Sequence, residues 1–376
     1  MAIVNEVEQA KRTVTTDAYQ MSFGEVVNLY QDKDLVINPE FQRLFRWTNS
    51  QKSRLIESIL LGIPIPPIFV YERTDGKWEL VDGLQRVSTV LEFMGVLRDA
   101  EADEADDPLP PSILSPTNYL PSLNNAVWER SDRIQGYALE DQIEIGKVLQ
   151  LSIRRSRIGV EILKRSSDAH TKYDLFQRLN SGGSVANAQE LRNCIAVMVN
   201  PLLFKSLRQL SFYTPFTTMV QSTEEQKKRQ RDLEYTMRFL VYRYIPYDGK
   251  MDVEEYINFG IVQIDERGLY TNEVEENFKA TFDLLNKALG ADGLKRYSET
   301  GFSGRVGLTG LEVVAVGVSF NLDALKLVKK PQDFVRQKVH ELWAVDDVND
   351  FSRAGMTGTQ RIQKSIPFGK DWFRPS

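Results

Sequence analysis

The sequence predicts an α+β fold, in which an N-terminal domain with a small mixed sheet precedes a mainly α-helical C-terminal domain. Three observations lead to this prediction. Strand, turn, strand and helix patterns follow one another within residues 68–94. Apolar residues alternate again in residues 157–163, which favours another strand. From Pro201 onward, the chain has mostly helical patterns.

The first hairpin is marked by the apolar run at residues 68–71 and by residues 77–81, which lie on either side of the turn Asp75-Gly76. Helical spacing begins after Asp82-Gly83, and Gly95 is expected to end that helix. An Asp-Gly pair therefore lies where a strand ends and a helix begins. Such a position offers free backbone N–H groups and the positive end of a helix dipole, which together suit a phosphate. An ordinary strand-to-helix turn is the alternative, and for this segment taken alone we favour it.

A second pattern lies upstream of the hairpin. Residues 37–43 are expected to be extended, because the residue before a proline is kept out of helical geometry. A helix is expected over residues 51–61, with Asn49 or Ser50 as its N-cap and Gly62 at its end. The helix and the hairpin thus form one α/β unit.

The middle of the chain carries an acidic, proline-ended stretch at residues 99–111. We expect a solvated loop inserted into the first domain, because the strand at residues 157–163 should return to the first sheet. A helix is then expected over residues 169–179, followed by a glycine-containing turn at 180–184 and a second helix over 186–199.

Length and composition limit the class of protein. A chain of 376 residues has room for two domains, which we place at residues 1–200 and 201–376. The net charge of −5 argues against coating nucleic acid by bulk charge, although it leaves room for a local basic groove. Cys194 is the only cysteine, which excludes an internal disulfide and a cysteine-based zinc site. With no signal peptide and no apolar run of the roughly 18 residues that a membrane span needs, we expect a cytoplasmic, bacterial protein.

Three ordered blocks resemble a known family over about the first 200 residues. The first joins Phe41-Gln42-Arg43 to residues 55–64, and the second is Asp82-Gly83-Leu84-Gln85-Arg86. The third joins residues 176–183 to Gln189-Glu190-Leu191-Arg192-Asn193. Together they resemble the DGQQR domain, which forms the N-terminal half of GmrSD-type, modification-dependent (type IV) restriction proteins. Three blocks in order are far more specific than a lone motif.

The resemblance implies a ParB/sulfiredoxin-like fold that binds and hydrolyses a nucleoside triphosphate with Mg²⁺. It makes Asp82, Gln85 and Arg86 the candidate catalytic residues, and Asp82 the candidate metal ligand. Phosphate would be bound by the Gly83 backbone and by Arg86, because a guanidinium pairs with phosphate in a bidentate way. The remaining nucleotide-binding candidates are Gln42, Arg43, Arg178 and Asn180. We expect Arg86→Ala to abolish nucleotide binding and to leave the melting temperature of the ligand-free protein nearly unchanged.

Two departures from the family bear on function. Leu84 stands where the family has its first glutamine, so this chain is expected to bind nucleotide without efficient turnover if that amide holds the nucleotide or the attacking water. The family also commonly carries a C-terminal HNH nuclease domain, whereas this chain has only His170 and His340. We therefore expect no nuclease half of that type.

Two hypotheses of different class follow. One is an NTP-hydrolysing component of a bacterial anti-phage defence or restriction system that acts on DNA. The alternative is a non-catalytic sensor of nucleotide or of modified phage DNA, which regulates a separate nuclease subunit. The resemblance is also compatible with a homodimer.

Two further segments leave alternatives open. Residues 224–233 carry Lys227, Lys228, Arg229 and Arg231, which could contact phosphates, although we favour a solvated helix face. Glycines recur every third residue around Arg305, but no Lys-Ser or Lys-Thr pair follows, so we favour a loop over a phosphate cradle. The absence of any GxxxxGK[ST] run excludes a P-loop enzyme.

Overall fold

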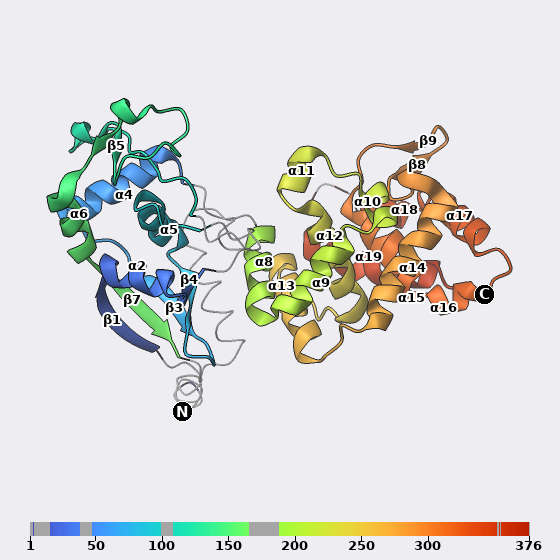
Figure 1. The fold of residues 1–376 in the computed structure, drawn as a ribbon. Coiled ribbons are helices and arrows are strands. Elements are labelled where there is room, and N and C mark those ends of the chain that lie inside the picture. Colours follow the sequence, from blue (N-terminus) through green and yellow to red (C-terminus); the bar gives the residue numbers. More distant parts are fainter. Residues whose placement is uncertain are drawn as a thin grey trace. The chain divides into compact units, whose positions relative to one another are not determined.

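The computed structural model describes residues 16–37, 47–98, 108–164, 188–351 and 355–375, together with residues 3 and 353. The chain divides into two compact units, residues 1–185 (unit 1) and 186–376 (unit 2) (Figure 1). From the sequence we placed the division near residue 200. Helix α8 (Ala188–Val199) therefore lies in unit 2, where it contacts helices α9 and α13.

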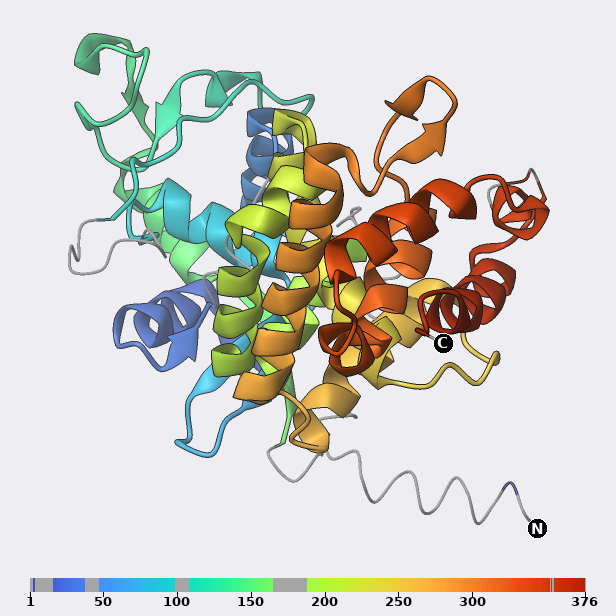
Figure 2. The ribbon, with the colours of Figure 1, turned by 90° about the vertical axis from the view of Figure 1, so that its right-hand side faces the viewer.

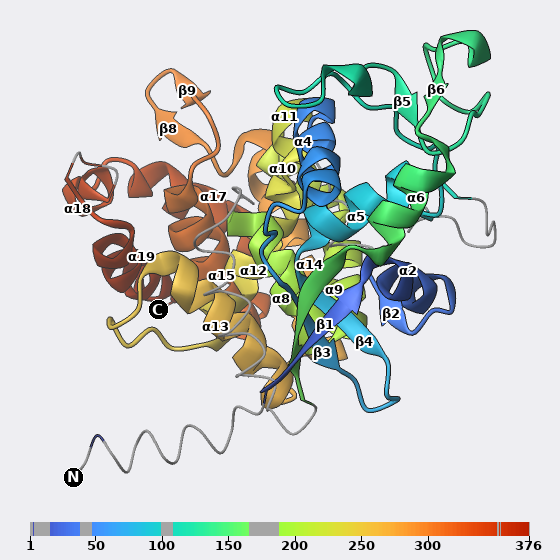
Figure 3. The same cartoon turned by 90° about the vertical axis from the view of Figure 1, so that its left-hand side faces the viewer.

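Unit 1 is built on a mixed five-stranded sheet, which confirms the predicted α+β class (Figure 3). Its strands lie in the order β1-β7-β3-β4-β2. Their bounds are β1 Thr16–Ser22, β2 Leu35–Val36, β3 Ile68–Glu72, β4 Trp78–Asp82 and β7 Arg157–Leu163. Strands β3 and β4 are antiparallel and joined by a turn in which Gly76 has a φ of 82°, as the Asp75-Gly76 pair predicts.

Strand β7 returns to this sheet from the far end of unit 1, as predicted. It pairs antiparallel with β1, where Thr16 faces Leu163, and parallel with β3, where Ile68 faces Val160. Alternate β7 residues Ile158, Val160 and Ile162 are buried, which fits the period of two. The acidic residues 99–107 lie outside the described part, and Pro108 pairs with Arg98 in an isolated bridge.

Helices cover the sheet of unit 1 and share one hydrophobic core with it. They are α2 Phe23–Gln31, α4 Asn49–Leu61, α5 Leu84–Phe93 and α6 Gly146–Arg155. Short elements follow α5, namely η1 Pro121–Leu123, β5 Ala126–Val127, η2 Leu139–Asp141 and β6 Ile143–Glu144. Strands β5 and β6 pair with each other in a parallel two-stranded sheet.

Helix α4 begins two residues earlier than predicted, at Asn49 and not at residue 51. The N-cap is Thr48, not Asn49 or Ser50. The Thr48 side chain accepts a hydrogen bond from the Gln51 backbone, and the Gln51 side chain accepts one from the Thr48 backbone. This reciprocal capping box satisfies two orphan donors at once, whereas a cap at Asn49 or Ser50 would lack the glutamine partner. Gly62 ends the helix with left-handed angles, as predicted.

Unit 2 is mostly helical, as predicted, and carries one small hairpin, drawn in orange in Figure 2. Its helices are α8, α9 Pro201–Ser211, α10 Thr214–Val220, α11 Glu224–Lys228, α12 Arg231–Tyr244, α13 Val253–Glu266, α14 Asn272–Leu289, η3 Gly290–Asp292, η4 Gly310–Ala315, α15 Val316–Phe320, α16 Leu322–Lys326, α17 Pro331–Leu342, α18 Asp346–Asp350 and α19 Gly358–Trp372. The hairpin pairs β8 Arg296–Ser298 with β9 Gly301–Ser303. No described helix is long and apolar enough to cross a membrane.

The basic stretch at residues 224–233 is not one helix face. It breaks at Gln230, a non-glycine residue with a φ of 59°, so that α11 ends before it and α12 begins after it. The glycines around Arg305 also have separate environments. Gly301 belongs to β9, whereas a Cβ on Gly310 would lie 2.1 Å from the Leu294 carbonyl oxygen.

Candidate functional site

The Asp82-Gly83 turn joins the end of β4 to the start of α5. Gly83 is the N-cap of α5, has a φ of 97° and provides no side-chain cap. A Cβ at this position would lie 2.4 Å from Cγ2 of Ile68 on the neighbouring strand. Glycine is therefore required both by the backbone angle and by the close approach of β3. The result is a helix start without a side-chain cap, as an anion site needs.

Arg86 binds two groups of its own unit. One Nη atom lies 3.0 Å from a carboxylate oxygen of Asp82 and 3.0 Å from the carbonyl oxygen of Pro67. The two side chains are 16% and 29% exposed, so solvent reaches both. The Nε atom of Arg86 is buried and has no hydrogen-bond partner among the described residues. The pair thus links the end of β4, the first turn of α5 and the entry to β3.

Gln85 and Leu84 point to different surroundings. The side-chain oxygen of Gln85 accepts a hydrogen bond of 3.2 Å from the backbone N–H of Trp47. This contact ties the motif to the segment between the two parts of the first family block. Leu84 is partly buried and packs against the hydrophobic core of unit 1. The position that departs from the family pattern is therefore used for packing.

The other predicted nucleotide-binding residues are not part of this geometry. Gln42, Arg43, Arg178 and Asn180 lie outside the described residues. Their approach to the Asp82-Gly83 turn therefore stays a prediction. The same holds for a magnesium ion at Asp82. Across the described ranges, no three His, Cys, Asp or Glu side chains come close enough to hold a metal by themselves.

A cavity of about 520 Å³ lies on the other side of Pro67, and the sequence analysis did not find it. Tyr19, Pro67, Arg157 and Glu161 are among its lining residues. Gly159 also lines it, and a Cβ there would lie 3.1 Å from the Pro67 side chain. A glycine inside a strand is the sequence signal for such a close approach. Because the Pro67 carbonyl binds Arg86, this cavity and the Asp82-Gly83 turn share one structural element.

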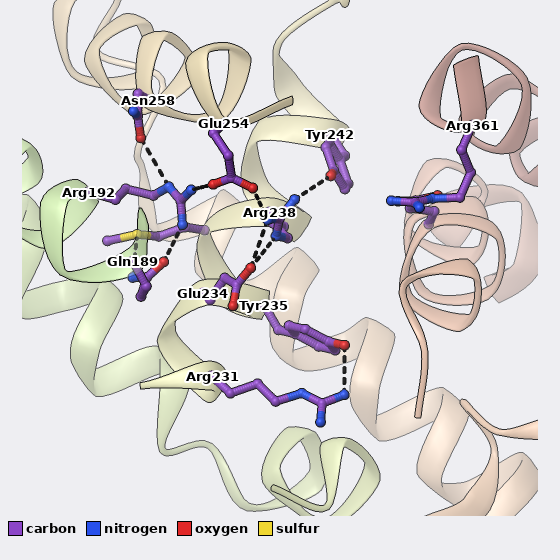
Figure 4. A network of polar contacts seen from close by, with 12 residues as sticks. Gln189, Arg192, Arg231, Glu234, Tyr235, Arg238, Tyr242, Glu254, Asn258 and Arg361 are labelled. Atoms are coloured by element: carbon purple, nitrogen blue, oxygen red, sulfur yellow. Dashed lines mark hydrogen bonds and ion pairs between the residues drawn. The ribbon is translucent and has the colours of Figure 1, made fainter. Parts of the chain in front are cut away.

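The last family block, residues 189–193, belongs to a buried polar network in unit 2 (Figure 4). Arg192 is fully buried and donates hydrogen bonds to Gln189, to Glu254 and, over 3.2 Å, to Asn258. Glu254 in turn accepts a hydrogen bond of 2.6 Å from Arg238. The network therefore connects α8 to α12 and α13.

Charges in this network balance, because Glu234 provides a second carboxylate 2.7 Å from Arg238. Burial lowers the pKa of Arg192, and Glu254 opposes that effect. Burial alone would raise the pKa of Glu254, but Arg192 and Arg238 outweigh it, so the net shift is downward. Each charge has a partner within the protein, as buried charges require. We conclude that this block stabilises the packing of unit 2.

Neither histidine is a candidate catalytic residue within the described part of the chain. His170 lies outside the described residues. His340 on α17 stacks on the ring of Tyr297, with ring centroids 3.9 Å apart. Burial and the nearby Arg336 lower the pKa of His340. Its contacts are thus those of a packed side chain.

Comparison with known protein families shows which family the N-terminal part of the chain matches. Residues 24–197 match the family described as GmrSD restriction endonuclease, N-terminal domain. Residues 24–197 are a domain of this family. The GmrSD-type match contains strands β2, β3, β4 and β7 of the mixed sheet and the Asp82-Gly83 turn, and it ends within α8. A search of curated proteins gave no match. The family implies a component of a restriction or defence system that acts on DNA.

Proposed function

We propose that this chain is a nucleotide-binding, NTP-hydrolysing component of an anti-phage restriction system, with its site at Asp82–Arg86. The observation that carries the proposal is the left-handed Gly83 at the start of α5, which brings uncapped backbone N–H groups to the end of a strand. This arrangement suits the phosphates of a nucleotide. The proposal also rests on the match to the GmrSD-type domain and on the resemblance of these residues to the DGQQR motif.

The Arg86–Asp82 pair fits a nucleotide that arrives with a divalent cation. Phosphate oxygens would take Arg86, and the cation would take Asp82, so that each side chain exchanges one partner of opposite charge for another. Mg²⁺ is commonly held by one or two carboxylates together with substrate phosphates and water, so a single aspartate suffices. Bound there, Mg²⁺ would neutralise phosphate charge. Gln85 would orient the attacking water, and Gln42 with Arg43 would close the far wall.

A specific observation favours the second candidate, a sensor without turnover. Leu84 packs against the core and provides no amide to the site. If hydrolysis needs that amide, nucleotide binding would act as a signal to a separate nuclease subunit. Binding to plain, methylated, hydroxymethylated and glucosylated duplexes then tests whether modified phage DNA is sensed. Equal affinity for all four duplexes would remove that part of the hypothesis.

Phosphate release separates the two candidates. The purified chain would be tested with ATP, GTP, CTP and UTP in the presence of Mg²⁺, with and without DNA. Asp82→Ala is the test variant, and Asp75→Ala is its matched control because Asp75 lies in the β3–β4 turn, where it contacts Arg73 and the Lys77 backbone. Release that is lost in Asp82→Ala alone supports the enzyme. Nucleotide-dependent thermal stabilisation without release supports the sensor, and neither effect would contradict both.

A further inference from the structure

A cavity in unit 2 brings together two segments that the sequence suggested separately. It has a volume of about 410 Å³. Arg229 and Arg231 reach it from the α11–α12 junction, and Arg305 reaches it from the glycine-containing segment before η4. Lys295 adds a fourth cationic side chain, against a single carboxylate from Glu225. The lining of this cavity is therefore strongly positive within a chain whose net charge is −5.

The cationic side chains differ in whether a carboxylate already neutralises their charge. Lys295 lies 2.6 Å from a carboxylate oxygen of Asp292. Arg229 lies 4.0 Å from Glu225, and both of those side chains are at least 75% exposed, so the pair contributes little. Arg305 is exposed and has no ion pair within the described part of the chain. The cavity thus keeps positive charge for a ligand.

Backbone geometry holds these side chains around the cavity. Arg231 donates hydrogen bonds to the Val306 carbonyl oxygen at 2.6 Å and to the Tyr235 hydroxyl at 2.7 Å. Figure 4 shows the second of these contacts. The Val306 contact fixes the Arg305 segment at the start of α12. Gln230 has the left-handed angles that separate Arg229 from Arg231, and its side chain accepts a hydrogen bond from Asn193. Left-handed non-glycine residues of this kind cluster at ligand sites.

Arg305 also lines a second cavity, of about 110 Å³. Trp343 lines this smaller cavity, and its indole nitrogen is buried without a hydrogen-bond acceptor among the described residues. The smaller cavity thus shares Arg305 with the larger one and includes a residue with a buried, unpartnered donor. An anionic ligand supplies the acceptors that such donors lack.

We propose that the cavity lined by Arg229, Arg231, Lys295 and Arg305 binds a compact ligand with linked phosphates, such as pyrophosphate or the polyphosphate arm of a free nucleotide. The volume lies at the lower end of the range for small-molecule sites, which favours a compact ligand over a nucleic-acid strand. The cavity is in unit 2, so this site is separate from the Asp82–Arg86 site of unit 1.

Calorimetric titration of the full chain with inorganic pyrophosphate tests the proposal. The wild-type chain should bind, and Arg305→Gln and Arg229→Gln should each weaken binding about tenfold or more, because each removes a charge-assisted contact. Lys228→Gln is the matched control, since Lys228 neighbours Arg229 on the chain, is equally cationic and does not line the cavity. It should change affinity by less than about twofold, because exposed charges are screened. Unchanged melting temperatures would show that the exposed variants fold.

The Arg86→Ala variant separates this site from the one in unit 1. Pyrophosphate binding that persists in Arg86→Ala supports the cavity, and displacement of pyrophosphate by ATP identifies a free nucleotide as the source of the phosphates. The proposal is overturned if the wild type does not bind at millimolar pyrophosphate, or if Lys228→Gln weakens binding as much as Arg305→Gln. It is also overturned if short single-stranded DNA binds in an Arg305-dependent way that pyrophosphate does not reverse.

Discussion

Gly83 shows how one residue sets the geometry of the candidate site. Its φ of 97° would strain the backbone of any residue with a side chain. A Cβ at this position would also clash with Ile68. The Asp-Gly pair could be read from the sequence as the junction of a strand and a helix. The contact with Ile68 could not, because it depends on how β3 and β4 pair. Local sequence therefore located the turn, and the sheet explains why glycine occupies it.

Gly83→Ala is expected to destabilise the protein by about 2–4 kcal/mol, because it adds the cost of a left-handed side chain to that of a clash with Ile68. Gly76→Ala is the matched control. Gly76 has a similar φ of 82°, but a Cβ there would have nothing within 4 Å. Its cost should be about 1 kcal/mol. Urea unfolding of both variants measures the difference, and equal costs would show that the Ile68 contact does not matter.

The expected effect of Arg86→Ala on stability changes once the contacts of Arg86 are known. A phosphate-binding arginine on a solvated turn should be removable without loss of stability. The structure instead gives Arg86 hydrogen bonds to Asp82 and to the Pro67 carbonyl. We therefore expect a loss of about 1–3 kcal/mol in the ligand-free protein. Differential scanning calorimetry should show a melting temperature lower by several degrees, and an unchanged value would mean that these contacts contribute nothing.

At the scale of single elements, most helices and strands followed from local signals. The predicted hairpin, the strand at residues 157–163 and the helix ending at Gly62 are all confirmed. The predicted N-cap of α4 was wrong, because Thr48, Asn49 and Ser50 are all residue types that cap helices well. The spacing from Thr48 to Gln51 distinguishes them, since a capping box needs Gln or Glu three residues after the cap.

Thr48→Ala should therefore destabilise α4, by about 0.5–2 kcal/mol. Ser50→Ala, on an exposed position of the same helical turn, should change stability by less than about 0.5 kcal/mol. Chemical unfolding of both variants gives the comparison. A larger loss in Ser50→Ala would mean that the helix begins later than the structure shows.

The network around Arg192 gives a prediction for the packing of α8, α12 and α13. Glu254→Gln leaves the buried Arg192 without its carboxylate, which should cost on the order of 3 kcal/mol at neutral pH. Glu255→Gln is the matched control, because the neighbouring Glu255 side chain is exposed. Urea unfolding should show the loss in the first variant only. Equal stability of the two variants would remove the network from the account of unit 2.

The same carboxylate gives this loss a pH dependence. The pKa of Glu254 in the folded protein lies below its ordinary value of 4.5, so its contribution is fully present above that value. It is lost as pH falls through the lowered pKa. The stability gap between wild type and Glu254→Gln should therefore narrow as pH falls from about 5 to about 3. A gap that stays constant over that window would contradict the lowered pKa.

Contacts between distant residues were beyond the sequence. Arg361 on α19 pairs with the fully buried Glu312, and its Nε atom lies 3.0 Å from Oε2 of that glutamate. Likewise, the basic residues of the α11–α12 junction and Arg305 gave weak separate signals, and only the fold brings them to one cavity. Such contacts depend on how the helices pack. The periodicity and residue spacing of a single sequence do not reveal that packing.

For the whole molecule, we propose two phosphate sites, one in each unit. The GmrSD-type domain holds the Asp82–Arg86 turn, and unit 2 holds the basic cavity. The first site would respond to a nucleoside triphosphate, and the second would respond to a compact phosphate ligand. A restriction component built in this way could make its action on DNA depend on nucleotide at either site.

The most direct test of the central claim is calorimetric titration of the full chain with each nucleoside triphosphate in the presence of Mg²⁺. It compares wild type with Arg86→Ala and with Arg73→Ala, whose arginine pairs with Asp75 on the hairpin of the same unit and is 43% exposed. To weaken binding in the basic cavity of unit 2, every protein would carry Arg305→Gln. We predict tight binding by the protein with wild-type unit 1 and by Arg73→Ala, and loss of that tight binding in Arg86→Ala. Binding of equal affinity in all three would contradict it.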